Sequence, residues 1–358
     1  MRSINLADIP LLATTVSVPQ FENTSLANFT YASGLALSPD GAALYVTEQL
    51  LSIIWVVRDP STATRTLSLN ASIFAGELDL NGGFAEGQGA IARFSQPTSI
   101  ATYPTDGSVY VTDMYNSRIR RISASGLAST FVGNGAPMST SFSPGNGAAG
   151  VTTGVIRIIA YSATDSSFFS YSETGHVLFK VGLNAQATAM SKRAIPYEDG
   201  PGFNARFSGP GGIAFDLLGN LLVADEFNRR IRAITPTGIV STLAGSGEQG
   251  GSNSPAASPL LLAATFYSPA GLAVDTNGDI FISDTGANNI RVIKAVQNAV
   301  VATLAGTGAK GSQNGPATSS TFDSPMRIAS RSGRVYVYDS GSSKYLSAMC
   351  AQALRRTA

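Results

Sequence analysis

One phrase recurs along the chain and constrains the fold more than any other feature. It reads TDMYNSRIRRI from Thr112, ADEFNRRIRAI from Ala224 and SDTGANNIRVI from Ser283. The second residue of each copy is an aspartate, and this aspartate ends a run of residues typical of a β-strand. Aligned on that acidic position, the copies number six and lie 54 to 65 residues apart, with Tyr171 in a degenerate third copy: Glu48, Asp113, Tyr171, Asp225, Asp284 and Asp339. Self-similarity at such a period indicates a repeat architecture.

Each unit has the same internal order of strand and turn signals. A Pro-Gly-aliphatic segment such as SPAGLAVD comes first, and a glycine-containing turn such as TNGD follows it. Asn and Gly accept the positive φ that a tight hairpin turn needs. The acidic-ended strand, the RIRRI-like strand and a closing strand such as VSTLAG complete the unit. Four short strands per unit, repeated four to eight times, are typical of a β-propeller.

The repeat therefore predicts one all-β domain over residues 1–358, a six-bladed β-propeller. We expect the blades near residues 29–76, 94–133, 153–190, 207–245, 266–306 and 322–350. The last unit lacks its closing strand, while LLATTVS from Leu11 is similar to IVSTLAG from Ile239. We expect residues 11–17 to form the outer strand of the last blade and to close the ring, which removes a sheet edge.

The motif D-x-x-N-x-R-I-R, after a P-x-G-I-A-x-D segment, resembles the NHL repeat. Two copies match it fully, through Asp113, Asn116, Arg118, Ile119 and Arg120 and through Asp225, Asn228, Arg230, Ile231 and Arg232. The resemblance implies a propeller over nearly the whole chain, but it implies little about function because one fold hosts many functions. The glycine-rich linkers look like those of secreted NHL proteins, which favours an extracellular setting.

Composition excludes several broad classes. The net charge of +1 argues against a general nucleic-acid or membrane field. No apolar run reaches the roughly 18 residues of a membrane span, and the start, MRSINLADIPLLATTV, does not have the pattern of a signal peptide. The single cysteine, Cys350, allows no disulfide within the chain.

Two sets of repeated residues are predicted to be structural. Asp113, Asp225 and Asp284 recur in equivalent positions, so we expect them to cap loops or to pair with the repeated arginines. Each linker ends in Phe, two residues and Pro, and a repeated aromatic residue is more often packing than a ligand site. We expect these phenylalanines to fill the gaps between blades: Phe94, Phe207, Phe266 and Phe322, with Phe29 before Ala32.

Strand parity places the long linkers and the DMYNSR-type loops on one face, where functional residues usually gather. Other positions, beside the proline that opens each unit, point to the mouth of the central pore: Gln96, Thr98, Ala270, Met326 and Arg327. From both groups we select these candidate partner-binding residues: Tyr115, Asn116, Glu226, Phe227, Asn228, Asn288, Met326 and Arg327.

The sequence favours a binding scaffold over an enzyme. Amidating lyases resemble this fold and use a multi-histidine zinc site, but His176, in an arginine position of the third unit, is the one histidine of the chain. We predict no metal and no cofactor. The leading hypothesis is a non-enzymatic scaffold that presents its linkers to a protein or glycan partner. Two alternatives stay open: a divalent-metal hydrolase or lyase at the pore mouth, which carboxylates lining it would favour, and an RNA-binding propeller, which a continuous arginine surface would favour.

Overall fold

The computed structural model describes residues 12–15, 31–58, 70–136, 142–191, 198–202, 204–253, 261–295, 299–317, 319–331, 334–341 and 347–350. Its strands form antiparallel sheets, and its helical segments are single turns. These turns are η2 (Gly89–Ile91), η3 (Met114–Asn116), α1 (Gly147–Gly150), η4 (Glu226–Asn228), η5 (Leu261–Ala263) and η6 (Thr285–Ala287). Among the described residues, no helix is long and apolar enough to cross a membrane. The architecture is an all-β propeller.

Five sheets are each built from one continuous stretch of chain. The first contains β2 (Ala32–Leu37), β3 (Ala43–Glu48), β4 (Ile53–Arg58) and β5 (Asn70–Ala75). The second contains β7 (Pro97–Thr102), β8 (Val109–Asp113), β9 (Arg118–Ile122) and β10 (Leu127–Val132), with β6 (Gly87–Gln88) at its outer edge. The third contains β12 (Ile156–Ser162), β13 (Ser167–Ser172), β14 (Val177–Gly182) and β15 (Gln186–Ala189), with β11 (Gly145–Asn146) outermost.

The fourth and fifth sheets continue this pattern. The fourth contains β17 (Pro210–Phe215), β18 (Leu221–Asp225), β19 (Arg230–Ile234) and β20 (Ile239–Ala244), with β16 (Gly200–Pro201) outermost. The fifth contains β21 (Pro269–Val274), β22 (Ile280–Asp284), β23 (Asn289–Ile293) and β24 (Val301–Ala305).

The remaining strands form a composite sheet. It contains β26 (Pro325–Arg331), β27 (Arg334–Asp339), β28 (Ser347–Cys350), β1 (Leu12–Thr15) and β25 (Gly315–Pro316). Strand β1 pairs with β28, Ala13 opposite Met349, and with β25, Leu12 opposite Pro316. Continuous stretches of chain thus form five blades. The sixth blade expected from the sequence stays a prediction, since the strands of the composite sheet come from segments far apart in the sequence.

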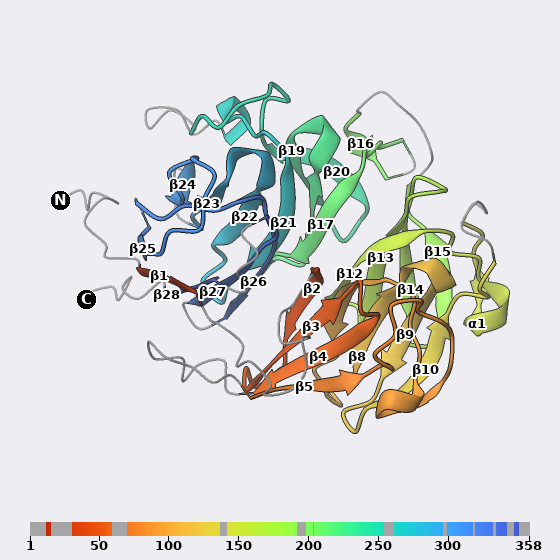
Figure 1. Cartoon of the computed structure of the whole chain (residues 1–358). Helices are drawn as coiled ribbons and strands as arrows, with labels where there is room; N and C mark the ends of the chain where they lie inside the picture. Colours follow the sequence, from red (N-terminus) through yellow and green to blue (C-terminus); the bar gives the residue numbers. More distant parts are fainter. Residues whose placement is uncertain are drawn as a thin grey trace.

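The first strand of each sheet lies innermost. These inner strands contact one another around the centre of the molecule in the order β2, β7, β12, β17, β21 and β26, and β26 contacts β2. Figure 1 shows β2, β12, β17, β21 and β26 gathered in the middle, with β5, β10, β15, β20 and β24 toward the outside. Each inner strand carries a β-bulge near its start, next to the pore: the bulges lie at 32/34, 97/99, 156/159, 210/212, 269/271 and 325/327.

The core lies between neighbouring sheets. Along β8, Val109 and Val111 pack toward the first sheet, whereas Tyr110 packs toward the third. Such strands are buried on both faces, which explains their nearly continuous apolar sequences. The predicted phenylalanine plugs are confirmed, because Phe94, Phe207, Phe266 and Phe322 are buried, each in a cluster that joins two sheets. Phe29 lies outside the described residues.

The third sheet corrects two assignments made from the sequence. Ile156 pairs with Ser172, just as Pro97 pairs with Asp113, so Ser172 and not Tyr171 occupies the acidic position. His176 does not occupy an arginine position either. It has a φ of 50°, like Ser117 in the second sheet, and therefore ends the turn between two strands. The alignment made from the sequence was offset by one residue in this unit, because the third unit lacks the aspartate that marks the register in the other units.

Candidate functional site

The linkers between sheets and the turns η3, η4 and η6 lie at the same ends of the strands. Backbone bonds join them: the Tyr115 amide donates to Ser95 O at 3.1 Å, the Phe227 amide to Ser208 O at 3.1 Å and the Thr285 amide to Ser268 O at 3.0 Å. We call this side the linker face. The β-hairpin turns between first and second strands, such as Leu217 and Leu218, lie on the opposite face, because consecutive strands run antiparallel.

Buried ion pairs lie beneath the loops of the linker face. Arg120 Nη1 lies 3.0 Å from Asp113 Oδ2, and Arg232 Nη1 lies 3.0 Å from Asp225 Oδ2, with all four side chains fully buried. In the fifth sheet Arg291 and Asp284 lie 3.6 Å apart and are also buried. The predicted pairing of the repeated aspartates with arginines is therefore confirmed.

The same arginines hold the linkers in place. Arg120 donates to the carbonyl oxygens of Ala85 and Arg93, at 2.8 and 3.1 Å. The equivalent bonds run from Arg232 to Glu198 O and Arg206 O, and from Arg291 to Ser252 O and Thr265 O. Each guanidinium also lies over the buried phenylalanine of its linker, at 5.0 to 5.4 Å from the ring centre. Each linker is thus fixed from below by one side chain.

Burial dominates the electrostatics of these pairs. It raises the pKa of Asp113 to about 6, although Arg120 and the Ser95 amide both favour the charged carboxylate. Burial raises the pKa of Asp225 and of Asp284 in the same direction. An ionised carboxylate is tolerated at such a depth only when its oxygens are matched by donors. These aspartates therefore serve the fold.

Three of the candidate binding residues also have structural contacts. Asn116 Nδ2 donates to Asp113 Oδ2 at 2.9 Å and to Gly83 O at 2.7 Å. Asn228 repeats the first of these bonds with Asp225, at 2.9 Å. Asn288 Oδ1 accepts from the Ser324 amide at 2.9 Å. Their polar groups are engaged with the chain itself.

Tyr115 and Phe227 project from the linker face. The two residues are 48% and 70% exposed, and each lies within a turn whose asparagine donates to a buried aspartate. Turns η3 and η4 both end in a residue of left-handed conformation, Ser117 with φ 50° and Arg229 with φ 54°. Phe227 rests against Gly209, where an added Cβ would lie 2.6 Å from the ring.

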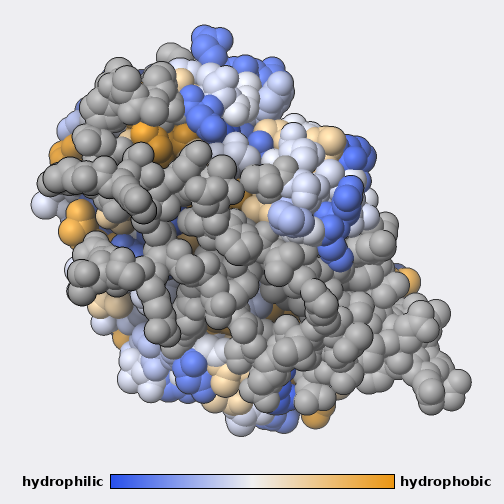
Figure 2. All heavy atoms as spheres, turned by 90° about the vertical axis from the view of Figure 1, so that its left-hand side faces the viewer, coloured by the Kyte–Doolittle hydropathy of each residue, from blue (hydrophilic) through white to orange (hydrophobic). Residues whose placement is uncertain are grey.

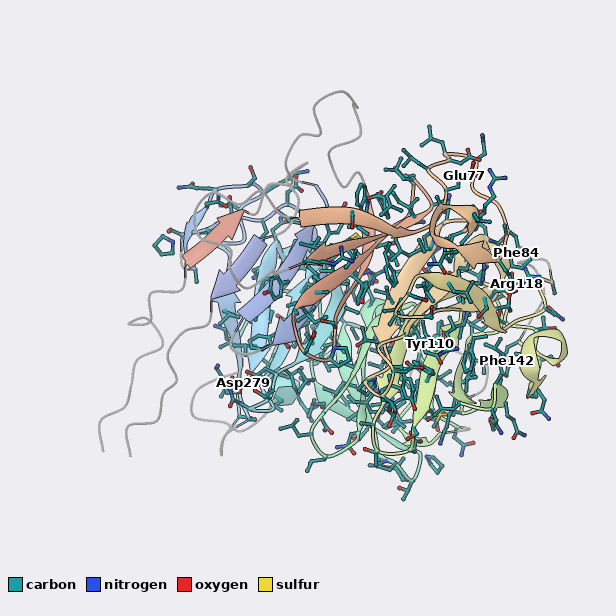
Figure 3. All side chains as sticks on the ribbon, turned by 90° about the horizontal axis from the view of Figure 1, so that it is seen from below. Glu77, Phe84, Tyr110, Arg118, Phe142 and Asp279 are labelled. Carbon is teal, nitrogen blue, oxygen red and sulfur yellow. The ribbon has the colours of Figure 1, made fainter. Side chains whose placement is uncertain are left out.

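A further aromatic side chain lies at the edge of this face. The Arg118 guanidinium stacks over the half-exposed ring of Phe84, 4.1 Å from its centre, and donates to Asn116 O at 2.9 Å. Figure 3 shows Phe84 and Arg118 next to each other at one side of the second sheet. Figure 2 shows another side of the molecule, where the coloured surface is mainly blue to white and the orange residues are separate.

Arg327 crosses the central pore. Its Nε donates to Ser33 O and its Nη1 to Gly211 O, both at 2.5 Å, so it joins the composite sheet to the first and the fourth. Burial lowers the pKa of Arg327, and Glu226 partly offsets this effect. Its neighbour Met326 is partly buried and packs against the core between the composite sheet and the first sheet. The other predicted mouth positions Thr98 and Ala270 are buried, and Gln96 accepts a bond from Gln49 at 2.9 Å.

Sequence reasoning missed two charged residues at the mouth. Arg157, in the bulge of β12, lies 2.9 Å from Glu173, and Glu226 acts on both Glu173 and Arg327. Burial raises the pKa of Glu173. The segment VIRIIAYS could have revealed Arg157, because it stands where other units have Pro-x-Gly. The degenerate sequence of the third repeat obscured this alignment. Among the described residues, no three His, Cys, Asp or Glu side chains are grouped as metal ligands.

The opposite end of the pore is lined mainly by apolar residue types. A funnel of about 410 Å³ is lined by all six inner strands, through residues such as Leu35, Ile100, Ile213, Leu272 and Ile328. A smaller cleft of about 260 Å³ lies between the third and fourth sheets, beside Phe169 and Lys180. Neither cavity includes a candidate residue from the sequence.

Comparison with known proteins gives matches at several levels. The NHL repeat model matches residues 266–293. Human NHL repeat-containing protein 2 is 36% identical over 98 residues, which is 26% of this chain and 13% of that protein. The match therefore spans a small part of the curated relative's length.

Solved structures share the fold over most of the chain. A protein of unknown function from Bacteroides thetaiotaomicron aligns with a TM-score of 0.69 at 16% identity, covering 95% of this chain and 76% of its own. Virginiamycin B lyase from Staphylococcus aureus aligns with a TM-score of 0.53 at 14% identity, covering 95% of this chain and 98% of its own. At these identities the likeness concerns the fold alone.

Proposed function

Because this chain is an NHL-repeat β-propeller protein, we propose that it is a non-enzymatic binding scaffold whose linker face holds a protein or glycan partner. The observation that carries the proposal is the pair of exposed aromatic side chains, Tyr115 and Phe227, on turns fixed by buried ion pairs. Aromatic anchors contribute most of the binding energy in many interfaces.

Rigidity of the loops supports this proposal. A side chain that is already held in place loses little conformational entropy when a partner binds. Arg120 holds the linker that precedes the second sheet, and Arg232 holds the linker that precedes the fourth sheet. The aromatic anchors beside these two linkers therefore keep a fixed spacing. Such a surface suits a partner with a defined shape, and aromatic residues flanked by small polar residues are common in binding loops.

We propose further that the propeller is a ring of six blades, closed by β1 in the composite sheet. The pairing of Ala13 with Met349 supports this closure, as does the contact of β26 with β2. The buried cluster of Tyr336 and Tyr338 with Leu44 and Val46 joins the composite sheet to the first sheet. A closed ring leaves no sheet edge exposed at the junction.

The alternative of RNA binding gains little support from the arginines. Arg120, Arg232 and Arg291 are fully buried and engaged with carboxylates and carbonyls, so they add nothing to a basic surface. The alternative of a hydrolase or lyase is supported by one observation, the carboxylates of Glu173 and Glu226 at the pore mouth. Turnover of a lactone or a cyclic depsipeptide by the purified protein, lost in Glu226→Gln, would favour that enzyme.

The scaffold proposal is tested with a double variant, Tyr115→Ala with Phe227→Ala. Wild type and variant are screened against an array of defined glycans and by cross-linking to proteins of the native source. We expect at least one partner that cross-links to the linker face and whose retention falls about tenfold or more in the variant, as for paired aromatic anchors.

The matched control is Leu217→Ala with Leu218→Ala, which removes two exposed apolar side chains from the opposite face. This control should retain the partner, and all three proteins should have equal melting temperatures. Retention of every partner by the Tyr115 and Phe227 variant would place binding on another surface and overturn the proposal.

A further inference from the structure

Four charged side chains of both signs meet at the pore mouth on the linker face. Arg157 and Glu173 form an ion pair at 2.9 Å. Glu226 acts electrostatically on Glu173 and on Arg327, and Arg157 acts on Arg327. The four come from three different sheets, so the chain brings them together only in the folded ring. Their formal charges cancel.

Arg327 is a cation held by neutral groups. Its two bonds go to the backbone oxygens of Ser33 and Gly211, and among the described residues no carboxylate lies within ion-pair distance of it. A guanidinium has five N–H donors. The residue is partly exposed, and the two bonds use two of its five donors, so donors are left that can reach a ligand anion.

Glu226 lies beside the same segment of β17. Its Oε1 accepts from Ser268 Oγ at 2.5 Å, and a Cβ added to Gly211 would lie 2.9 Å from its Oε2. Gly211 also supplies the carbonyl that holds Arg327. A carboxylate and a guanidinium are therefore placed on either side of one glycine, without a direct ion pair between them among the described contacts.

We propose that this mouth binds a small zwitterion of the α-amino acid class, with its carboxylate on Arg327 and its ammonium group on Glu226. A simple anion at Arg327 would be repelled by the nearby Glu226, and a simple cation at Glu226 would be repelled by Arg327. A ligand with both charges meets an opposite charge at each end, and charge-assisted hydrogen bonds are the stronger kind. A side chain at position 211 would collide with the backbone of Ala270 and with Glu226 Oε2, so glycine is what allows Glu226 to lie this close to β17. This site goes beyond the binding of a partner to the surrounding loops.

Isothermal titration calorimetry of the full chain tests the proposal with four probes: glycine, L-phenylalanine, acetate and methylammonium. We expect one or both amino acids to bind, and acetate and methylammonium to bind at least about tenfold more weakly, since each makes only one of the two charge-assisted contacts. Acetate or methylammonium binding as tightly as the amino acids overturns the proposal. So does the absence of binding by both amino acids.

Two variants locate the site. Glu226→Gln and Arg327→Gln should each weaken amino acid binding about tenfold or more. The control is Arg121→Gln, which removes one partner of an exposed ion pair on the second sheet and should leave amino acid binding unchanged. If Arg327→Gln fails to fold because it joins three sheets, Glu226→Gln decides alone. Binding retained in Glu226→Gln overturns the proposal. The Tyr115→Ala variant should keep amino acid binding, so this result is independent of the partner.

Discussion

At the scale of residues, the ion pairs beneath the linker face connect the sheets to the linkers. Asp225 accepts from Arg232, Asn228 and the Ser208 amide, and Arg232 in turn holds two linker carbonyls. Removing one partner of such a pair leaves the other charge buried and unmatched, which costs more than the pair itself contributes. A substitution of Asp225 or Arg232 therefore removes contacts within the sheet and contacts to the linker.

We therefore expect Asp225→Ala to lower the free energy of unfolding by about 3–5 kcal/mol, the usual cost of breaking a buried ion pair. The matched control is Asp106→Ala, whose partner Arg121 lies at the surface, 41% exposed. An exposed pair contributes about 1 kcal/mol or less. Urea denaturation followed by circular dichroism measures both, and equal losses would mean that the buried pair is not a stabilising contact.

At the scale of elements, the turns η3, η4 and η6 show one geometry with three different sequences. Each closes on a residue in the left-handed region: Ser117, Arg229 and Asn288, with φ of 50°, 54° and 50°. A residue with a Cβ pays about 1–2 kcal/mol for this conformation, and Gly does not. Asn suits the position best among the three, whereas Arg229 is strained there.

Arg229→Gly should therefore stabilise the protein by about 1 kcal/mol relative to Arg229→Ala. Both substitutions remove the same long side chain, whose one hydrogen bond within the described part of the chain is a 3.4 Å bond to Gly247 O, so the comparison isolates the backbone effect. Melting temperatures measured by differential scanning calorimetry give the result. A glycine variant less stable than the alanine variant would show that the turn does not store strain.

At the scale of the whole molecule, the proposed closure of the ring depends on the composite sheet. Strand β1 lies between β28 and β25, so it pairs on both sides. Deleting residues 1–18 should lower the stability of the ring by several kcal/mol, as expected for the loss of an apolar strand. Deleting residues 1–10 leaves β1 in place and serves as the control. Thermal unfolding of the two truncations compares them, and identical melting temperatures would exclude a clasp.

How far the sequence predicts this molecule depends on the regularity of each unit. The repeated aspartates, arginines and phenylalanines were predictable because identical residues at a fixed period must meet identical surroundings. Ser172 and His176 were not, since the third unit lacks the aspartate that sets its register. Arg157 and Glu173 were missed for the same reason. Their meeting with Glu226 depends on the curvature of the ring, which brings different sheets together and leaves no mark in the local sequence.

The pairing of Ala13 with Met349 also has a consequence for biosynthesis. A chain made from its amino end can complete the first five sheets one after another, because each is formed by a continuous segment, and such units fold as they emerge. The composite sheet has to wait until β28 has been translated, because that strand is one of its members. Until then β1 lacks its partner β28 and the first sheet lacks its neighbour β26, so we expect ribosome-bound intermediates to be the stage at which this protein is most prone to aggregation.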